Sequence, residues 1–220
     1  MKKYLAKEQQ SNIENIIAKV EEKTSCEIVP VLARASDKYL HASYFGGFIL
    51  SLVVYMMVSI CYQFQGHGNW NSITYLEYQG IIIGIMICSF VSGAWLTQKV
   101  PALMLPFISR EEMDLQVRRR ARQAYFDYCR GRTEQDTGII LYISLFEHIV
   151  LVQGDNAVSK KISQQQWQDI SDMMLAQLKQ GNIEQAFIDG IKQTGRLTSK
   201  FFPLKTMAEN QLPNEIRFIG

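Results

Sequence analysis

The sequence has almost no charged side chains over a long central stretch. Between His41 and Arg110, in a chain of 220 residues, the only Asp, Glu, Lys or Arg side chains are Glu77 and Lys99. A stretch of this kind is typical of segments that lie inside a lipid bilayer. The mean hydropathy of −0.06 conceals it, because that value averages an apolar middle with polar ends.

Paired cysteines are also missing. The four cysteines stand singly in the chain: Cys26, Cys61, Cys88 and Cys129. Without a C-x-x-C pair, they argue against both a zinc site and a disulfide framework, and we expect free thiols. The net charge of +2 is too small to indicate a nucleic-acid partner. We expect no cleavable signal peptide, because Lys2 and Lys3 are followed by polar residues rather than an apolar core.

Recognisable catalytic motifs are absent from the sequence. It contains no P-loop, no C-x5-R, no G-x-S-x-G, no H-E-x-x-H and no calcium-binding D-x-D-x-[DN]-G loop. The three histidines, His41, His67 and His148, are expected at the membrane edge, in an outer loop and on a strand. We therefore do not expect them to converge on one metal ion.

What the central stretch does contain is two apolar blocks, residues 42–64 and 78–98, joined by a short polar loop at 65–77. A helix needs roughly 20 residues to cross a bilayer core of about 30 Å, so each block is long enough. We predict a transmembrane hairpin. Gly80 and Gly84 form a G-x-x-x-G pattern in the second block, which predicts close helix packing.

The positive charges predict the orientation of this hairpin. The loop at 65–77 has no Lys or Arg, whereas Lys38 precedes the first block and Lys99 and an arginine cluster follow the second. By the positive-inside rule, both termini are cytoplasmic. The segment 99–108 is apolar but contains Pro101 and Pro106, so we expect it to lie along the membrane surface.

The polar ends of the chain alternate between helical and strand patterns. Apolar spacing predicts a helix over 5–23, a buried strand over 27–33 and a helix that begins with a capping box at 109–112. Strands follow at 138–144 and 148–154, with helices after Ser163 and after a box at Asn182 and Gln185. Pro30 suggests an edge or a bulge in the first strand. The tail to residue 220 shows no clear period.

This order predicts an α/β fold in which residues 1–41 and 109–220 form one discontinuous cytoplasmic domain. The helix from Ser109 would be the crossover between two parallel strands, and the membrane hairpin would be inserted into that crossover. The carboxyl ends of these strands would then face the bilayer, because the first strand leads directly into the membrane.

Several motifs resemble those of the TPM domain family. They are the segments 22–31, 137–147 and 149–155, followed by Phe202-Pro203 and by the segment 210–215, where Gln211 and Asn214 stand in place of two acids. The pattern is similar to the bacterial membrane-bound branch of that family, in which a hairpin interrupts the domain. The resemblance implies a Rossmann-like α/β sandwich in the bacterial inner membrane. It also implies associations with phosphatase activity, metal binding and the assembly of membrane complexes.

Three acids are candidate ligands for a divalent cation such as Ca²⁺ or Mg²⁺: Asp37, Glu147 and Asp155. Asp37 and Glu147 are expected at the carboxyl-end edge of the sheet, where α/β proteins bind ligands, and Asp155 at the opposite edge. They are therefore not expected to form one cluster. Each also has an ordinary interpretation as a turn residue.

An arginine cluster follows in the helix after Ser109, about 13 to 20 Å along its axis. It consists of Arg118, Arg119, Arg120 and Arg122. These side chains would either contact anionic lipid headgroups or form a solvated face that signals orientation. We favour the second interpretation, because four charges so close in sequence fan out around a helix.

Two functions remain open. The first is a non-enzymatic, membrane-anchored interaction or assembly module for a membrane complex, with lipids and a membrane protein as partners. The alternative is a divalent-metal-dependent phosphatase-like hydrolase. We favour the first, because the sequence shows no recognisable catalytic set, and the oligomeric state stays open.

Overall fold

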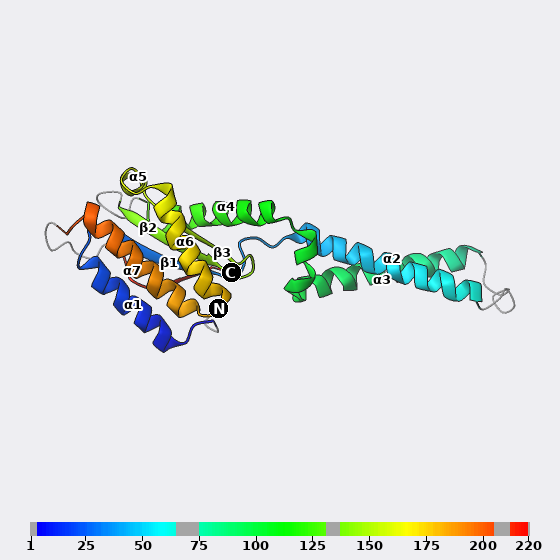
Figure 1. The fold of residues 1–220 in the computed structure, drawn as a ribbon. Helices are drawn as coiled ribbons and strands as arrows, with labels where there is room; N and C mark the ends of the chain where they lie inside the picture. The colour runs from blue at the N-terminus through cyan, green and yellow to red at the C-terminus, as the bar shows by residue number, and fades with distance from the viewer. Residues whose placement is uncertain (1–3, 65–74, 131–136, 205–211, 220) are drawn as a thin grey trace. The chain divides into compact units, whose positions relative to one another are not determined.

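The computed structural model describes residues 4–64, 75–130, 137–204 and 212–219. The elements are α1 (Lys7–Glu21), β1 (Glu27–Ala33), α2 (Leu40–Phe64), α3 (Tyr75–Lys99), the 3-10 helices η1 (Pro101–Leu103) and η2 (Leu105–Phe107), α4 (Arg110–Tyr128), β2 (Gly138–Ser144), β3 (Ile149–Gly154), α5 (Asn156–Ser159), α6 (Gln164–Lys179), α7 (Ile183–Phe201) and β4 (Arg217–Ile219). They form two compact units, Lys38–Glu112 and the remainder of the chain. The predicted α/β class with a small mixed sheet is confirmed (Figure 1).

The α/β unit contains a four-stranded sheet in the order β3-β2-β1-β4. β1 pairs in parallel with both β2 and β4, while β3 returns antiparallel to β2. β1 and β2 are buried almost throughout because helices cover both of their faces. This double burial explains why both strands read as continuous apolar runs in the sequence.

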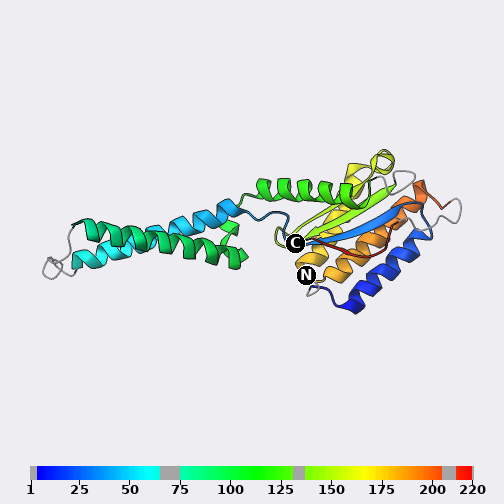
Figure 2. The same ribbon diagram turned by 180° about the vertical axis from the view of Figure 1, so that it is seen from behind.

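Alternate residues of the strands belong to two separate cores, and Figure 2 shows helices on both faces of the sheet. On one face α1, α6 and α7 pack over residues such as Ile28 and Leu141. On the other face α4 packs over residues such as Val31 and Tyr142. The alternation follows from the period of two in a strand. The sheet is therefore a middle layer whose edges, and not its faces, are left for binding.

Pro30 is accommodated because its ring nitrogen lies where no ladder bond is needed. The N–H of Glu27 donates to Thr137, on the β2 side, so the N–H groups of residues 28 and 30 point away from β2. On that other side β4 begins pairing only opposite Val31. Pro30 thus occupies a locally unpaired edge of β1, as the sequence suggested.

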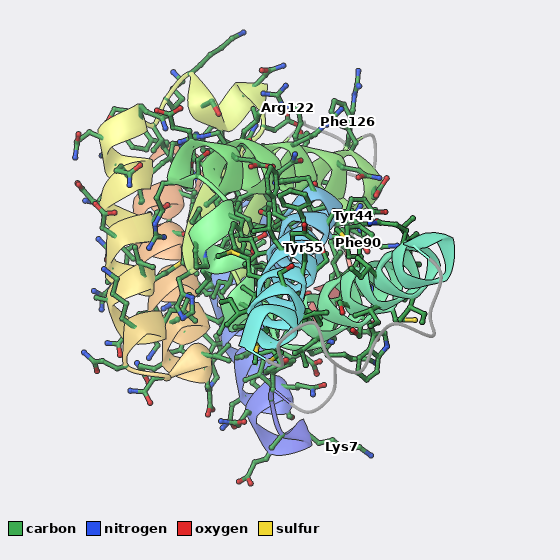
Figure 3. All side chains as sticks on the ribbon, turned by 90° about the vertical axis from the view of Figure 1, so that its right-hand side faces the viewer. Lys7, Tyr44, Tyr55, Phe90, Arg122 and Phe126 are labelled. Atoms are coloured by element: carbon green, nitrogen blue, oxygen red, sulfur yellow. The ribbon has the colours of Figure 1, made fainter. Side chains whose placement is uncertain are left out.

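The second unit consists mainly of α2 and α3, which pack against one another along their length. Two windows, Leu40–Cys61 and Gln79–Lys99, each have a mean hydropathy of 2.0, and only 11% of each window is buried. Both helices are long enough and apolar enough to cross a membrane. Tyr44 of α2 stacks on Phe90 of α3 with ring centroids 6.4 Å apart, and Figure 3 shows the two side chains.

Small residues form the seam between α2 and α3. A Cβ added to Gly47 would lie 2.5 Å from the carbonyl oxygen of Phe90, and one added to Gly93 would lie 2.9 Å from the Cα of Gly47. The two backbones therefore approach closely at this point. In contrast, a Cβ at Gly80 or Gly84 would meet nothing within 4 Å. The G-x-x-x-G pattern is not part of the seam that the described residues form.

Four local predictions need correction. His148 lies in a turn with φ 51° and not on the strand, which begins at Ile149. The predicted box at Asn182 is wrong, because its side chain makes no capping bond. The short helix α5 was not predicted, and the tail forms β4 beside β1. Four and three residues, respectively, are too few for a periodic pattern to show.

The seam predicts a clear difference between glycines of the same helix pair. Gly47→Leu should lower the stability of the hairpin by about 1 to 3 kcal/mol through overpacking, whereas Gly84→Leu should leave it unchanged. Thermal unfolding of the detergent-solubilised chain measures both. A Gly84→Leu variant that loses as much stability as Gly47→Leu would contradict this seam.

Candidate functional site

The carboxyl ends of β1 and β2 lie side by side and continue together beyond the sheet. Ala33 and Ser144 are paired in the register. Beyond them the N–H of Leu145 donates to the carbonyl of Ala33 at 3.0 Å, and the N–H of Phe146 donates to the carbonyl of Arg34 at 3.0 Å. The turn after β2 is therefore held against the segment after β1. This is the edge at which α/β proteins bind ligands.

Glu147 joins these two segments from the inside. Its side chain is buried, and its Oε1 accepts the backbone N–H of Ser36 at 2.7 Å. Its Oε2 accepts the hydroxyl of Ser144, which in turn accepts the hydroxyl of Ser36 at 3.0 Å. We call this closed set of hydrogen bonds among Ser36, Ser144 and Glu147 the carboxylate clip. Both oxygens of the carboxylate are engaged in it.

Tyr142 extends the clip into the sheet. Its hydroxyl lies 3.2 Å from the Oγ of Ser36. Burial raises the pKa of this phenol to about 12; the charge of Glu147 adds to the rise, and the bond to Ser36 and the charge of Arg120 oppose it. Tyr142 is therefore neutral at any physiological pH. It acts as a structural hydrogen-bonding group and not as a base or a nucleophile.

A polar cavity opens beside the clip. It has a volume of about 390 Å³, and its lining residues are Ser36, Asp37, Gln116, Arg119, Arg120 and Gln123. The lining contains two guanidinium groups and one carboxylate, so cationic charge is in excess. The Nη1 of Arg120 donates to the Oε1 of Gln123 at 2.8 Å, which orients the guanidinium. Such a set suits a carboxylate or a phosphate, because guanidinium donors bind either group bidentately.

The three candidate acids have different positions. Asp37 lines the cavity, whereas Glu147 lies buried behind it in the clip. Asp155 lies at the other end of β2, where its N–H donates to the carbonyl of Gly138 and its side chain caps α5. Among the described residues, no three His, Cys, Asp or Glu side chains form a group that could hold a metal ion. The three acids therefore do not fit a shared cation.

The four arginines fan out around α4. Arg118 pairs with Asp114, with 2.7 Å between its Nε and the Oδ2 of the carboxylate. Arg119 and Arg120 line the cavity, and Arg122 is exposed and extends outward, as Figure 3 shows. Residues in a helix are about 100° apart, so neighbours point in different directions. Contact of these side chains with lipid headgroups stays a prediction.

Sequence reasoning missed Ser36, Ser144 and Tyr142. A signal was present, because Ser144 ends an otherwise apolar strand and Ser36 follows another. Polar residues at the ends of two parallel strands meet at one edge of a sheet. The pattern could not show that the side chain of a third residue, Glu147, is buried beside both serines and accepts hydrogen bonds from them.

A second acid, half-buried, lies elsewhere, at the end of α1. The carboxylate of Glu21 accepts the N–H of Ile28 at 3.0 Å. Burial is the largest influence and raises its pKa to about 8; the charge of Glu27 also raises it, and bonds from Ile28 and Asn214 lower it. Because the folded state holds this proton more tightly than the unfolded chain, the contribution of Glu21 to stability falls as pH rises from about 4.5 to 8.

Asn214 contacts this half-buried carboxyl group from the C-terminal segment. It is one of the two amides that stand where the family that the chain resembles has acids. An acid at position 214 would add a like charge beside Glu21. The amide therefore suits a chain in which Glu21 is half-buried.

Comparisons with known proteins agree with this α/β unit. A family profile described as the TPM domain matches residues 109–197, from the start of α4 into α7. The NMR structure of the BA42 protein from the psychrophilic bacterium Bizionia argentinensis is similar, with a TM-score of 0.58 and 19% identity, and the match covers 97% of this chain and 94% of that one. At this identity the likeness shows the fold alone. No curated protein matches the chain.

The clip predicts that Glu147 is a structural residue. Glu147→Ala should lower the free energy of unfolding by about 2 to 5 kcal/mol, because it leaves two buried donors without an acceptor. Glu147→Gln should cost less, since its amide oxygen still accepts one of them. Urea unfolding of the full chain in detergent, followed by far-UV circular dichroism, measures the difference. Equal stability of Glu147→Ala and the unchanged protein would contradict the clip.

Proposed function

We propose that this chain is a membrane-anchored interaction module, whose α/β domain lies in the cytoplasm of a bacterium and binds an acidic group of a membrane-protein partner. Binding takes place in the cavity beside the carboxylate clip. The chain would serve the assembly or turnover of a complex in the inner membrane. Both termini are cytoplasmic in this proposal.

The character of α2 and α3 supports the membrane anchor. Large apolar side chains are exposed along both helices, for example Phe48, Met57, Ile87 and Val91. Exposure of so much apolar surface to water is unfavourable, whereas lipid covers it without cost. Lys99 lies over the ring of Trp95 at 5.8 Å, a pairing that suits the interface between lipid and water.

The covalent chain places the cavity near this anchor. Asp37, which lines the cavity, precedes the first residue of α2, Leu40, by three positions. Three residues span at most about 10 Å. A group bound in the cavity is therefore always within a short distance of the point at which the chain enters α2. In this proposal the chain enters the bilayer at α2, so the partner binds close to the membrane surface.

The hydrogen bonding of the site favours recognition of a partner over catalysis. The buried carboxylate and the two hydroxyl groups of the clip satisfy one another, and Tyr142 is held neutral. Besides the carboxylate of Asp37, the cavity presents the guanidinium groups of Arg119 and Arg120 and the amides of Gln116 and Gln123. These groups bind anions without transferring protons. The hydrolase alternative receives no comparable support from the described residues.

A charge reversal in the cavity tests this proposal. A photo-crosslinking amino acid at Gln116 should capture a protein partner in native membranes. Arg120→Glu should reduce that product about tenfold, because it replaces a cation facing an acidic group by an anion. Arg122→Glu is the matched control, since it makes the same charge change on the same helix outside the cavity.

Three outcomes would overturn the proposal. The first is an equal loss of product in both arginine variants, which would show a general charge effect. The second is capture of lipid in place of protein, which mass spectrometry of the product detects. The third is a crosslinked product that Arg120→Glu leaves unchanged.

A further inference from the structure

The edge strand β3 presents a row of backbone groups that the described chain does not use. β3 is the outermost strand on its side of the sheet and pairs with β2 alone. Its residues alternate between half-buried and buried along the strand. Its other edge is covered by none of the described strands.

One hydrogen bond determines which backbone groups point outward. The N–H of Asp155 donates to the carbonyl of Gly138 at 2.9 Å, so these residues form a hydrogen-bonded pair of the antiparallel ladder. Such pairs recur at every second residue. Gln153 and Leu151 therefore bond to β2. Val152 and Val150 lie between them and direct their N–H and C=O groups to the free edge.

These outward groups have no partner among the described residues. No hydrogen bond connects the backbone of Val150 or Val152 to any element other than the sheet, and both residues are buried, at 9% and 6% exposure. At the end of β3 the outward carbonyl of Gly154 already has a partner, because the hydroxyl of Ser159 donates to it at 2.9 Å. The outward N–H and C=O groups of a strand at the edge of a sheet can pair with a further strand.

The free edge forms the floor of a groove of about 330 Å³. Trp167, Ser171 and Leu175 of α6 line one wall, and Asp114 and Arg118 of α4 line the other. α4 and α6 lie on opposite faces of the sheet, as Figure 1 shows. Trp167 is only 4% exposed, and among the described residues its indole N–H has no hydrogen-bond partner. The groove is thus lined by the unpaired backbone groups of β3 and by a large aromatic side chain of α6.

Common devices that protect an edge strand are missing from β3. Its sequence, IVLVQG, contains no proline and no charged residue, and its pairing with β2 runs without a bulge. Proteins that do not bind at an edge usually carry one of these devices. Their absence favours an edge that is occupied when the protein functions.

We propose that this groove binds an extended segment of a partner protein, which adds to the sheet as a strand beside β3. The donors and acceptors of Val150 and Val152 match the backbone of an antiparallel strand, with which they would form two hydrogen-bonded pairs. Apolar side chains of the segment would face Trp167, and polar ones would face the Asp114–Arg118 ion pair. The site is separate from the cavity of Arg119 and Arg120, so either proposal can fail without the other.

A second copy of this chain suits the groove less well. Pairing of two β3 edges would bring a second α4 and a second α6 to the same edge, where the first pair already forms both walls. An extended segment brings only one strand. The occupant that the structure favours is therefore a peptide segment.

The probe for this proposal is a random peptide library, selected against the full chain in lipid nanodiscs after removal of peptides that bind empty nanodiscs. N-methylation of every second peptide residue should lower the affinity about tenfold, because it removes an N–H that bonds to β3. N-methylation of the residues between them should change the affinity little. Val152→Pro should have a similar effect, because it removes an outward N–H without breaking a bond to β2. Val152→Ala is the control that keeps the N–H and should still bind.

The N-methylation series uses the unchanged protein, so it stays informative even if Val152→Pro fails to fold. A loss of affinity with a period of two supports strand addition. A selection without binding peptides, or a loss without that period, overturns the proposal. So does a dimer of the chain in nanodiscs that Val152→Pro converts to a monomer, because a second copy would then fill the groove.

Discussion

The bond between a buried carboxylate and one backbone N–H organises the edge of the sheet in this protein. The carboxylate of Glu147 accepts the backbone N–H of Ser36 and the hydroxyl of Ser144. The hydroxyl of Ser144 in turn accepts the hydroxyl of Ser36. This carboxylate clip holds the segment after β1 against the turn after β2, two segments separated by more than 100 residues of chain. The same segment leads along the chain to α2, so the clip also holds Ser36, which precedes the first residue of that helix, Leu40. A buried carboxylate with both oxygens engaged contributes rigidity and no free base.

Helices cover both faces of the sheet, which limits where a partner can bind the α/β unit. α4 covers one face, and α1, α6 and α7 cover the other. The two surfaces proposed for binding are the carboxyl-end cavity and the outer edge of β3. The first offers guanidinium groups and the second offers backbone donors and acceptors. A partner in the cavity would recognise charged and polar side chains, whereas a partner at β3 would pair with the backbone and pack against Trp167.

The sequence predicted the parts of this fold that depend on local pattern. β1 and β2 were predicted at their observed bounds, because strands buried on both faces are unbroken apolar runs. The Ser163 cap is confirmed, with its Oγ accepting from Gln166. β4 was missed, since three residues carry no period. Glu147 could be recognised only as a turn residue or a ligand, because its burial depends on Ser36, which is remote in the chain. Gly80 and Gly84 matched a packing motif, but the choice of the seam at Gly47 depends on how the helices cross.

Hydrogen exchange at the amide of Ser36 tests the clip most directly. In the unchanged protein this amide should be protected to the level of Leu145 and Phe146, whose N–H groups cross between the same two segments. In Glu147→Ala it should exchange rapidly, while the amides of β1 that bond to β2 keep their protection. Rapid exchange at Ser36 in the unchanged protein would contradict the account, because it would show that the carboxylate does not hold the segment after β1.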